Sequence, residues 1–328
     1  MPSISSLLIH LTKVKIKDIE FKLKHTVNPK KDFTRDRVNT FENVLGMLIL
    51  RIVKSISVEL FSFFSHVGVQ EYCSRQALSK ARKKLKHTAF IELNKDYVSN
   101  FYKHSKRNLK LFDNKYLLFS TDGSLLQLPE SSTIVNHFGS WKNNSNKSMP
   151  MARAMVIYDV LNEQIISNKI SPINIGETTT FKILYKDVKT DFPIIHLMDR
   201  AYPSFDLCSQ MTAKGGFFVI RCKKDFCKSL SEFVISDQTD AAIILKNSIY
   251  WDKKTGKKVT SEFTKPLKVR ALKIPLSENN EEYIITNLWG YDSMTIKELY
   301  GKRWGVETMY DYLKNTLEIE NFSSKTVE

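Results

Sequence analysis

The sequence predicts an α/β protein in which a basic, all-helical segment precedes a body of mixed strands and helices. The first observation is the charge: residues 1–110 carry 22 Lys and Arg against 9 Asp and Glu, a net charge of +13, which leaves 28 against 26 for residues 111–328. The second is the spacing of apolar residues, which changes near residue 114 from a helical period to short continuous runs typical of buried strands. The chain is therefore expected to divide near residue 110.

The composition sets the class of protein. With 328 residues, of which 42% are hydrophobic, the chain has enough apolar material for two or three domains. The overall charge of +15 indicates a large polyanion as partner rather than a neutral metabolite. The spacing of the cysteines supports neither a zinc finger nor a disulfide framework and fits a reducing cytosol; they are Cys73, Cys208, Cys222 and Cys227.

The N-terminus, MPSISSLLIHLTK, predicts no export signal, because it has no early positive charge ahead of a long apolar run and no small-residue cleavage pattern. Apolar stretches within residues 43–70 are interrupted by Arg51, Lys54 and Glu59, so each is too short to cross a bilayer core of about 30 Å. We expect a cytoplasmic protein with no membrane partner.

The basic segment is predicted to be helical. Apolar residues recur at helical spacing from residue 38 to residue 56, and a second apolar helix is expected over Leu60–Phe64. The first pattern consists of Val38, Phe41, Val44, Leu45, Leu48, Ile52 and Ile56.

The run SRQALSKARKKLKH predicts a basic amphipathic helix with Ser74 as its N-cap. Its apolar side would carry Leu78, Ala81 and Leu85, and its polar side Gln76, Lys80, Lys83 and His87. In a helix-turn-helix, Gln76, Lys80 and Lys83 would lie near base edges or phosphates, with Arg82, Lys84 and Lys86 on the DNA backbone. A solvated basic helix without a DNA role explains the same pattern equally well.

The body begins with alternating strands and helices. Tyr116–Ser120 is a short apolar run that leads into Thr121, Asp122 and Gly123. This pattern predicts a buried strand with a carboxylate at its carboxyl end. A second buried strand over Pro193–Met198 ends in the same way, at Asp199. We also expect a hairpin over residues 151–160 and 164–170, helices over 177–188 and 204–211, and a strand over 217–220.

Residues 222–291 predict an inserted β-rich unit, because the short β-branched and aromatic runs EFVIS, AIIL, SIYW, KVRALKI and EYIIT are separated by polar stretches. A helix follows, opened by a capping box at Thr295 and Glu298 and running to about Leu317. Its interior Gly305 costs about 1 kcal/mol relative to Ala, so something other than helix propensity keeps a small residue there.

This last helix presents two stripes. The apolar stripe, which would face the sheet, consists of Leu299, Val306, Tyr310, Leu313 and Leu317. A second stripe along its margin consists of Tyr300, Arg303, Glu307 and Lys314. A carboxylate flanked by cations is therefore expected at the edge of the core.

Asp122, Asp199 and Glu307 together suit hard divalent cations, which prefer oxygen ligands. Such a site fits two-metal phosphoryl transfer, and the basic charge makes DNA the expected substrate. Each carboxylate taken singly has a simpler explanation. Asp122 before Gly123 is typical of a turn, and Asp199 could form a local ion pair with Arg200. Glu307 could be an exposed helix residue that pairs with Arg303. The three carboxylates with the adjacent cationic stripe favour the catalytic interpretation.

We expect four segments along the chain. Residues 1–110 would form a basic helical DNA-binding domain and residues 111–221 the first part of a catalytic core. Residues 222–291 would form the β-rich insertion. Residues 292–328 would carry the core helix with Glu307 and a short tail.

The pattern Tyr300-x2-Arg303-x3-Glu307-x6-Lys314, within LYGKRWGVETMYDYLKNTLEIENF, resembles the Y-R-E-K signature of DDE insertion-sequence transposases of bacteria. STDGS and HLMDRAY are similar to the two aspartate motifs of that family, and the resemblance covers most of residues 35–325. It implies an RNase H-like mixed-sheet core in which Asp122, Asp199 and Glu307 bind two Mg²⁺ ions, with Mn²⁺ as a substitute.

The resemblance also implies a reaction in which water attacks a phosphodiester at the transposon end and frees a 3′-OH. This 3′-OH attacks the opposite strand to give a hairpin, and after the hairpin reopens it attacks target DNA. Tyr300, Arg303 and Lys314 would hold the terminal phosphates. Trp289 would stack on an unpaired or flipped base or pack in a core. Arg200 would contact DNA or orient Asp199.

The chain ends 14 residues after Lys314, where similar transposases continue with further helices, so we expect a C-terminally truncated copy. The implied partners are double-stranded DNA, as terminal inverted repeats and target, and a second copy in a homodimer on that DNA; the protein would be nucleoid-associated. Two alternatives remain open: a catalytically inactive truncated transposase that binds DNA as a repressor, and a metal-dependent nuclease that cuts DNA without rejoining it.

Overall fold

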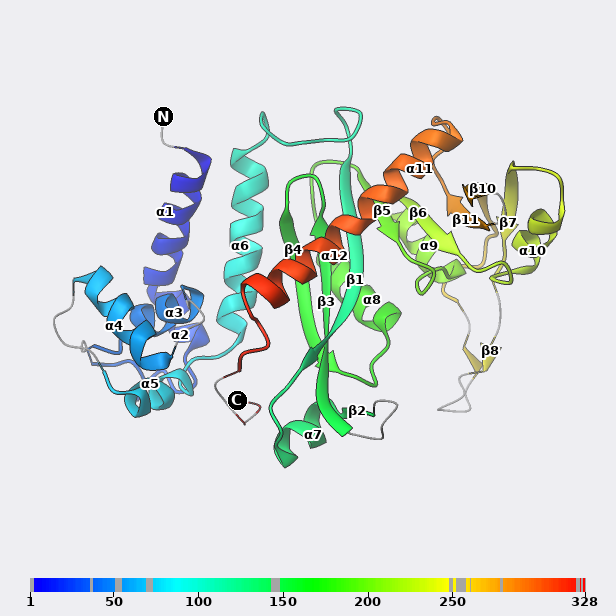
Figure 1. The fold of residues 1–328 in the computed structure, drawn as a ribbon. Helices are drawn as coiled ribbons and strands as arrows, with labels where there is room; N and C mark the ends of the chain where they lie inside the picture. Colours follow the sequence, from blue (N-terminus) through cyan, green and yellow to red (C-terminus); the bar gives the residue numbers. More distant parts are fainter. Residues whose placement is uncertain are drawn as a thin grey trace. The chain divides into compact units, whose positions relative to one another are not determined.

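The computed structural model describes residues 3–35, 38–50, 55–68, 73–142, 148–247, 250–251, 258–259, 261–277, 280–322, 325 and 327 (Figure 1). The chain forms two compact units. The helical unit contains Met1–Asn108, Pro129–Ile134 and Asp311–Glu328, and the sheet unit contains Leu109–Leu128 and Val135–Tyr310. Among the described residues, no helix combines the length and the apolar character that a bilayer-crossing segment needs.

The first third of the chain is helical, as predicted. Its helices are α1 (Ile4–Lys17), α2 (Ile19–His25), α3 (Phe41–Ile49), α4 (Ile56–Val67), α5 (Arg75–Arg82) and α6 (Thr88–His104). Side chains that accept a hydrogen bond from a first-turn N–H begin four of them: Ser3, Asp18, Thr40 and Ser74. Helix α4 ends at Gly68, whose φ of 77° lies in the left-handed region that glycine adopts at low cost.

Two apolar clusters hold these helices together. In the larger one Phe41, Val44 and Leu45, from the predicted helical pattern, are buried with Phe21 and Leu93. The second contains Met47, Leu60, Phe64 and Leu78. The pattern from residue 38 to residue 56 thus belongs to two helices, α3 and α4, and Ile52 lies outside the described residues.

Helix α5 is shorter than predicted. Ser74 is its N-cap, and Leu78 and Ala81 are buried, as expected. The helix nevertheless ends at Arg82, because the chain turns there and Leu85 forms a β-bridge with Thr26. Lys83 and His87 therefore do not continue its polar side, and a tertiary contact has overridden the helical pattern.

The sheet unit is built on one large mixed sheet whose strands run in the order β2-β3-β1-β5-β6-β11-β10-β7, with β4 paired to β3. Its first strands are β1 (Leu117–Gln127), β2 (Ser140–Lys142), β3 (Ser148–Asp159), β4 (Gln164–Pro172), β5 (Ile194–Met198) and β6 (Phe217–Cys222). β3 is antiparallel to β1 and to β4, whereas β5 is parallel to both β1 and β6. This is the RNase H-like arrangement that the resemblance implied, and the predicted α/β fold class is confirmed.

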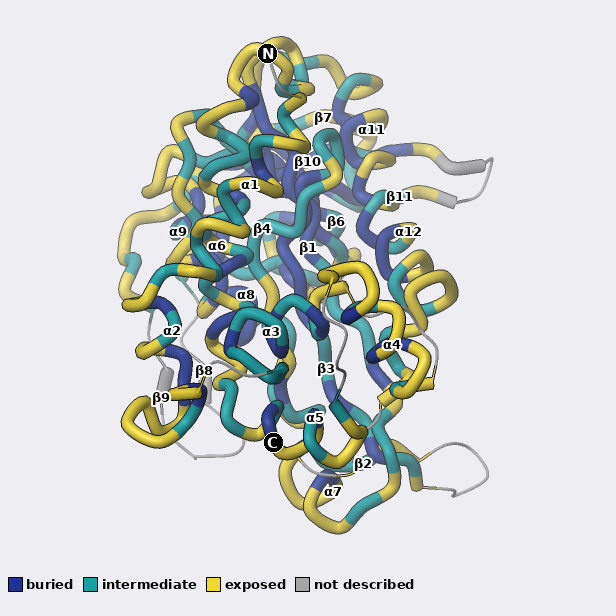
Figure 2. The backbone as a smooth tube through the Cα atoms, turned by 90° about the vertical axis from the view of Figure 1, so that its left-hand side faces the viewer, coloured by how far each residue is buried: buried dark blue, intermediate teal, exposed yellow. Residues whose placement is uncertain are grey.

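Three helices accompany these strands: α7 (Ser132–Phe138), α8 (Glu177–Lys186) and α9 (Phe205–Ala213). Helix α8 packs against β1, β3 and β4, and α9 packs against β6. Figure 2 shows the central strand β1 among the buried parts of the chain, and its first residues, Leu117 and Leu118, are fully buried. The predicted hairpin, helices and buried strands of this part of the chain are therefore confirmed.

The predicted insertion contains α10 (Lys228–Ile235), β7 (Asp240–Leu245), β8 (Tyr250–Trp251), β9 (Lys258–Val259), β10 (Leu267–Ser277) and β11 (Asn280–Thr286). β11 pairs with β6, so most of these strands extend the same sheet. The strand predicted for EFVIS is wrong, because residues 232–235 end α10. There Leu230 and Phe233, three residues apart, are both buried as the apolar side of a helix.

The helix predicted over residues 295–317 is divided into α11 (Ser293–Gly301), a 3₁₀ turn (Lys302–Trp304) and α12 (Gly305–Asp311), and the sheet unit contains these elements as far as Tyr310. The predicted capping box is wrong, because Asp292 is the N-cap and accepts a 2.7 Å hydrogen bond from the Thr295 N–H. A Cβ on Gly305 would lie 3.4 Å from the Val160 side chain, which is an ordinary van der Waals contact, so packing does not explain the small residue.

The apolar stripe of this helix is confirmed only in its first part. Leu299, Val306 and Tyr310 are buried, whereas Leu317 is 44% exposed. Leu317 follows a π-helical turn (Tyr312–Thr316) in the helical unit, and the wider turn changes the angular spacing on which the predicted stripe depended.

We predict that the ion cluster around Glu92 makes the stability of the helical unit depend on pH. The Glu92 carboxylate lies 2.5 Å from Lys24 Nζ, 3.0 Å from His25 Nε2 and 3.3 Å from Lys15 Nζ. The hydrogen bond from Lys24 is the main reason why the pKa of Glu92 falls from 4.5 to about 2. The pKa of Glu92 is lower in the folded protein than in the unfolded chain. The stabilisation from the ionised Glu92 is therefore complete above about pH 4.5 and is lost as the pH falls towards 2.

Urea unfolding followed by circular dichroism checks this with Glu92→Gln, and with Glu20→Gln, an exposed carboxylate on α2, as control. The free energy of unfolding of Glu92→Gln should lie below that of the wild type near neutral pH, with the difference shrinking below about pH 4.5. A difference that stays constant down to about pH 2 would contradict the assignment.

Candidate active site

The register between β1 and β5 places two of the predicted carboxylates. The parallel pairs run from Leu117 and Ile194 to Thr121 and Met198, so Asp122 and Asp199 are the next residues on the two neighbouring strands. β1 does not end at Asp122 as predicted but continues to Gln127, because β3 pairs with it along that length. The carboxylate at the end of a strand is thus Asp199, and Asp122 lies where β1 loses its parallel neighbour.

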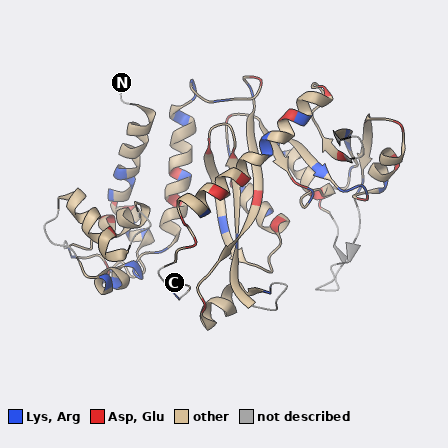
Figure 3. Ribbon diagram, in the orientation of Figure 1, with Lys and Arg blue, Asp and Glu red and all other residues tan. Residues whose placement is uncertain are grey.

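Glu307 lies on α12, which two side-chain hydroxyls attach to the sheet. The Tyr310 hydroxyl lies 2.9 Å from the Ala154 carbonyl and 3.2 Å from the Asp122 carbonyl, on β3 and β1. The Ser120 hydroxyl donates to the Arg303 carbonyl at 3.2 Å. Figure 3 shows acidic residues of α12 where this helix crosses β1 and β3. The position of Glu307 is therefore fixed relative to Asp122.

Arg303 connects two of the three carboxylates. Its guanidinium donates to Glu307 Oε1 at 2.6 Å and lies 4.0 Å from Asp122 Oδ2. Only 8% of Arg303 is exposed, and its guanidinium lies 5.7 Å from the centre of the Tyr300 ring. A desolvated guanidinium between two carboxylates compensates their charge far better than an exposed one would.

A fourth carboxylate, Glu177 at the start of α8, lies beside Asp122. A Cβ on Gly123 would be 3.0 Å from Glu177 Oε1, and Arg153 on β3 pairs with the same oxygen. Burial raises the pKa of Asp122 to about 6, and the charges of Glu177 and Glu307 act in the same direction. The charge of Arg303 opposes this increase in the pKa of Asp122, and burial of the carboxyl group outweighs it.

Asp199 has a separate partner. Arg221, at the end of β6, donates from Nε to Asp199 Oδ1 at 2.9 Å and also pairs with Glu282 on β11. The Tyr300 hydroxyl lies 3.5 Å from the same Asp199 oxygen, and burial raises the pKa of Tyr300 to about 12, so the hydroxyl keeps its proton. Asp199 therefore pairs with Arg221, and the local ion pair considered with Arg200 does not form.

The donor chemistry of this site fits a hard divalent cation, because the three predicted residues supply only carboxylate oxygens. Within the part of the chain that the structure describes, no three Asp, Glu, His or Cys side chains approach closely enough to form a metal-binding group. Arg303 and Arg221 instead hold Asp122, Glu307 and Asp199 by ion pairs. These residues therefore fit such a cation in donor type, and a bound cation would share them with the two arginines.

The remaining predicted residues do not all join this group. Arg200 is exposed and lines a cleft of about 460 Å³ with Arg221. Trp289 is 50% exposed with Lys268 Nζ 5.5 Å from its ring centre, so the core-packing alternative for Trp289 is wrong. Lys314 lies in the π-helical turn of the helical unit, whereas the three carboxylates belong to the sheet unit. The predicted DNA contacts Gln76, Lys80, Arg82, Lys83 and Lys84 lie on α5 and the turn after it, and Gln76, Lys80 and Lys83 are exposed.

The sequence did not predict three features of the site. These are the presence of Glu177, the presence of Arg221 and the role of Tyr310 in attaching α12 to the sheet. Tyr310 was assigned to the apolar stripe, and only its buried hydroxyl shows the second role. Arg221 ends a predicted strand next to the one that leads to Asp199, so the strand order carried a signal for it. For Glu177 the only signal was its place at the start of a predicted helix.

The profile of the transposase DDE domain family matches residues 113–328. The chain belongs to this family. The predicted resemblance to DDE transposases is thereby confirmed, and this transposase acts in DNA transposition. Divalent metal ions are the general cofactors of such domains.

A search of curated proteins found no relative that matches this transposase. Among solved structures, it is similar to a piggyBac transposase in a synaptic complex with hairpin DNA, at 12% sequence identity and with a TM-score of 0.48. That similarity covers 94% of this transposase and 68% of the other chain.

We predict that Gly123→Ala disturbs the site through Glu177. The new methyl group would contact the Glu177 carboxylate at 3.0 Å, and overpacking of this kind costs roughly 1–3 kcal/mol. The variant should melt at a lower temperature and cleave DNA more slowly. Gly290→Ala is the matched control, because an added Cβ there has no neighbour within 4 Å. Equal melting temperatures and cleavage rates for the two variants would show that Glu177 moves aside freely.

Proposed function

We propose that this transposase carries out cut-and-paste transposition, using Asp122, Asp199 and Glu307 as its catalytic carboxylates. The observation that carries the proposal is the placement of Asp122 and Asp199 at adjacent positions of neighbouring parallel strands, with α12 fastened across β1 so that Glu307 shares Arg303 with Asp122. Carboxylates brought together from two strands and a helix serve no packing purpose, since burying them costs free energy.

In the proposed reaction, the oxygen of water attacks the phosphorus at the transposon end, and the 3′ oxygen leaves. The freed 3′-OH next attacks a phosphodiester of the opposite strand, whose 3′ oxygen leaves with the flanking DNA, and a hairpin forms. Water reopens the hairpin, and the regenerated 3′-OH attacks a phosphodiester of target DNA, where a 3′ oxygen leaves. Asp122, Asp199 and Glu307 would hold two Mg²⁺ ions, or Mn²⁺ in their place, which supply activation of the attacking oxygen and stabilisation of the leaving one. The steps need no covalent link to the protein.

The chain's own residues would orient the phosphate. Arg303 is positioned by its hydrogen bond to Glu307, and its planar guanidinium suits the charge that develops on a phosphate under attack. The protonated Tyr300 hydroxyl, near Asp199, would donate a hydrogen bond to a phosphate oxygen. By analogy with the family signature, Lys314 supplies a further cation, Arg200 a contact beside Asp199, and the exposed ring of Trp289 a stacking surface for an unpaired base.

The helical part of residues 1–110 is proposed to bind the transposon end. What supports this is its net charge of +13 and the exposure of Gln76, Lys80 and Lys83. Clustered cations release condensed counterions from DNA and so supply affinity that depends on salt. A homodimer on the DNA would bring the two ends of the element together.

The decisive experiment incubates the full chain with a labelled duplex of its own element's end, with Mg²⁺, with Mn²⁺ or with EDTA, and resolves the products on a denaturing gel. Metal-dependent cleavage at the end, followed by joining to a target duplex, supports the proposal. Cleavage without joining would identify a nuclease, and binding without cleavage would identify a repressor derived from a transposase.

We predict that Glu307→Gln reduces cleavage to background, because the amide cannot supply the charge of the carboxylate. The dissociation constant for the end duplex should change by less than about threefold, since phosphate contacts supply most of the affinity. Glu298 is an exposed glutamate on α11, and Glu298→Gln should leave both the cleavage rate and the dissociation constant unchanged. Equal loss of binding and cleavage in Glu307→Gln would argue against a catalytic carboxylate.

A further inference from the structure

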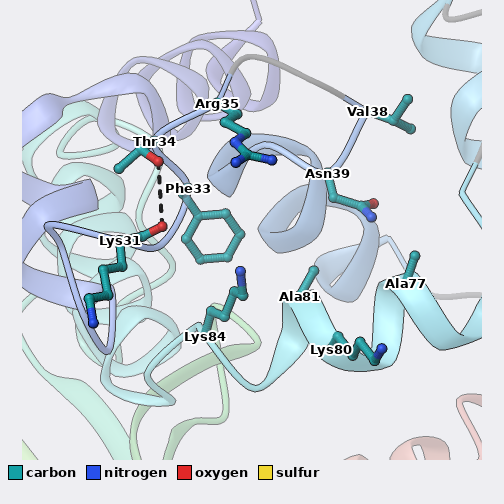
Figure 4. A pocket seen from close by; sticks show the side chains of 10 residues that line it. All are labelled: Lys31, Phe33, Thr34, Arg35, Val38, Asn39, Ala77, Lys80, Ala81 and Lys84. Atoms are coloured by element: carbon teal, nitrogen blue, oxygen red, sulfur yellow. Dashed lines mark hydrogen bonds between the residues drawn. The ribbon is translucent and has the colours of Figure 1, made fainter.

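A cleft of about 610 Å³ opens in the helical unit between α5 and the turn that follows α2. Its rim carries four cationic side chains, from Lys31, Arg35, Lys80 and Lys84, and Phe33 and Ala81 contribute apolar surface. Figure 4 shows the Arg35 guanidinium and the Lys84 ammonium approaching the Phe33 ring from opposite sides. Lys31 and Arg35 lie in the turn that follows α2, outside the residues of α5 and its following turn that were predicted to contact DNA.

The cations of this cleft are incompletely compensated. Lys84 Nζ lies 3.3 Å from Asp32 Oδ1, which provides one counter-charge. Lys31, Arg35 and Lys80 are exposed, and with the described residues they form no ion pair. Positive charges that converge on one cavity repel one another, and an anion placed in the cavity removes that cost.

The turn that carries Lys31 and Arg35 is held in one shape. Phe33 has a φ of 55°, which is unfavourable for a bulky residue, yet its buried ring packs edge-on against Phe41 at 5.6 Å. The Val27 N–H donates to the Lys84 carbonyl at 2.8 Å, and this bond joins the turn to the end of α5. A cleft whose walls are joined in this way needs little reorganisation to bind a ligand.

We propose that this cleft binds the sugar-phosphate backbone of the transposon-end DNA, with Arg35, Lys31 and Lys80 contacting its phosphates. Phe33 and Ala81 are buried but line the cleft between these cations, and their apolar atoms suit a deoxyribose between phosphates, whereas a free anion would use only the rim. The inference rests on the proposed function, since it takes the helical unit as the DNA-binding part. It adds Lys31 and Arg35 as contacts and makes the turn after α2 part of the interface.

The test measures the affinity of the full chain for the end duplex over a range of salt concentrations, in EDTA so that the DNA stays intact. The double variant with Lys31→Gln and Arg35→Gln should bind about tenfold more weakly, and the slope of log K against log salt should fall by about 2 in magnitude. The control carries Lys13→Gln and Lys17→Gln, two exposed lysines on α1, and so makes the same change in net charge. Circular dichroism verifies that both variants are folded.

Phosphate ethylation interference locates the contact. Ethylation at one or two adjacent phosphates should weaken binding of the wild type but not of the Lys31 and Arg35 variant. If both double variants lose equal affinity and show the wild-type interference pattern, the cleft is not the contact, and the proposed function stands without it. If the wild type fails to bind the end duplex at all, the proposed DNA-binding role of the helical unit fails first.

Discussion

The parallel pairing of β1 with β5 is the constraint on which the rest of the site depends. Backbone hydrogen bonds fix the register from Leu117 to Thr121, and Asp122 and Asp199 follow from it without any further interaction. The helix that carries Glu307 is then located by hydroxyl groups that reach sheet carbonyls, most directly Tyr310. Main-chain geometry therefore positions the carboxylates, so the repulsion between them can do little to move them apart.

The charge balance of the site is maintained by arginine rather than by lysine. Arg303 and Arg221 each contact two carboxylates at once, and a guanidinium suits this role because its several N–H donors point in fixed directions in one plane. Burial raises the pKa of Asp122, and the charges of Glu177 and Glu307 act in the same direction while Arg303 opposes them. The same surroundings that make Asp122 costly to ionise give it affinity for an added cation.

Much of this architecture could be predicted because its signals are local. The apolar runs before Asp122 and Asp199 are each a few residues long, and Tyr300, Arg303 and Glu307 lie within eight consecutive residues. Errors arose where a distant contact decides the outcome. The bridge between Thr26 and Leu85 ends α5 early, and the pairing of β3 extends β1 beyond Asp122. Arg221 and Glu177 join the site through strand order and helix packing, which no local pattern contains.

The connectivity of the sheet also bears on how the protein folds. Paired residues of β1 and β5 are 77 positions apart, and the Tyr310 hydroxyl reaches a carbonyl 188 residues away. Each such contact closes a long loop, and the entropy of that closure is lost before the contact forms. The carboxylates are consequently scattered charges in a partly folded chain. Only the completed fold brings them together.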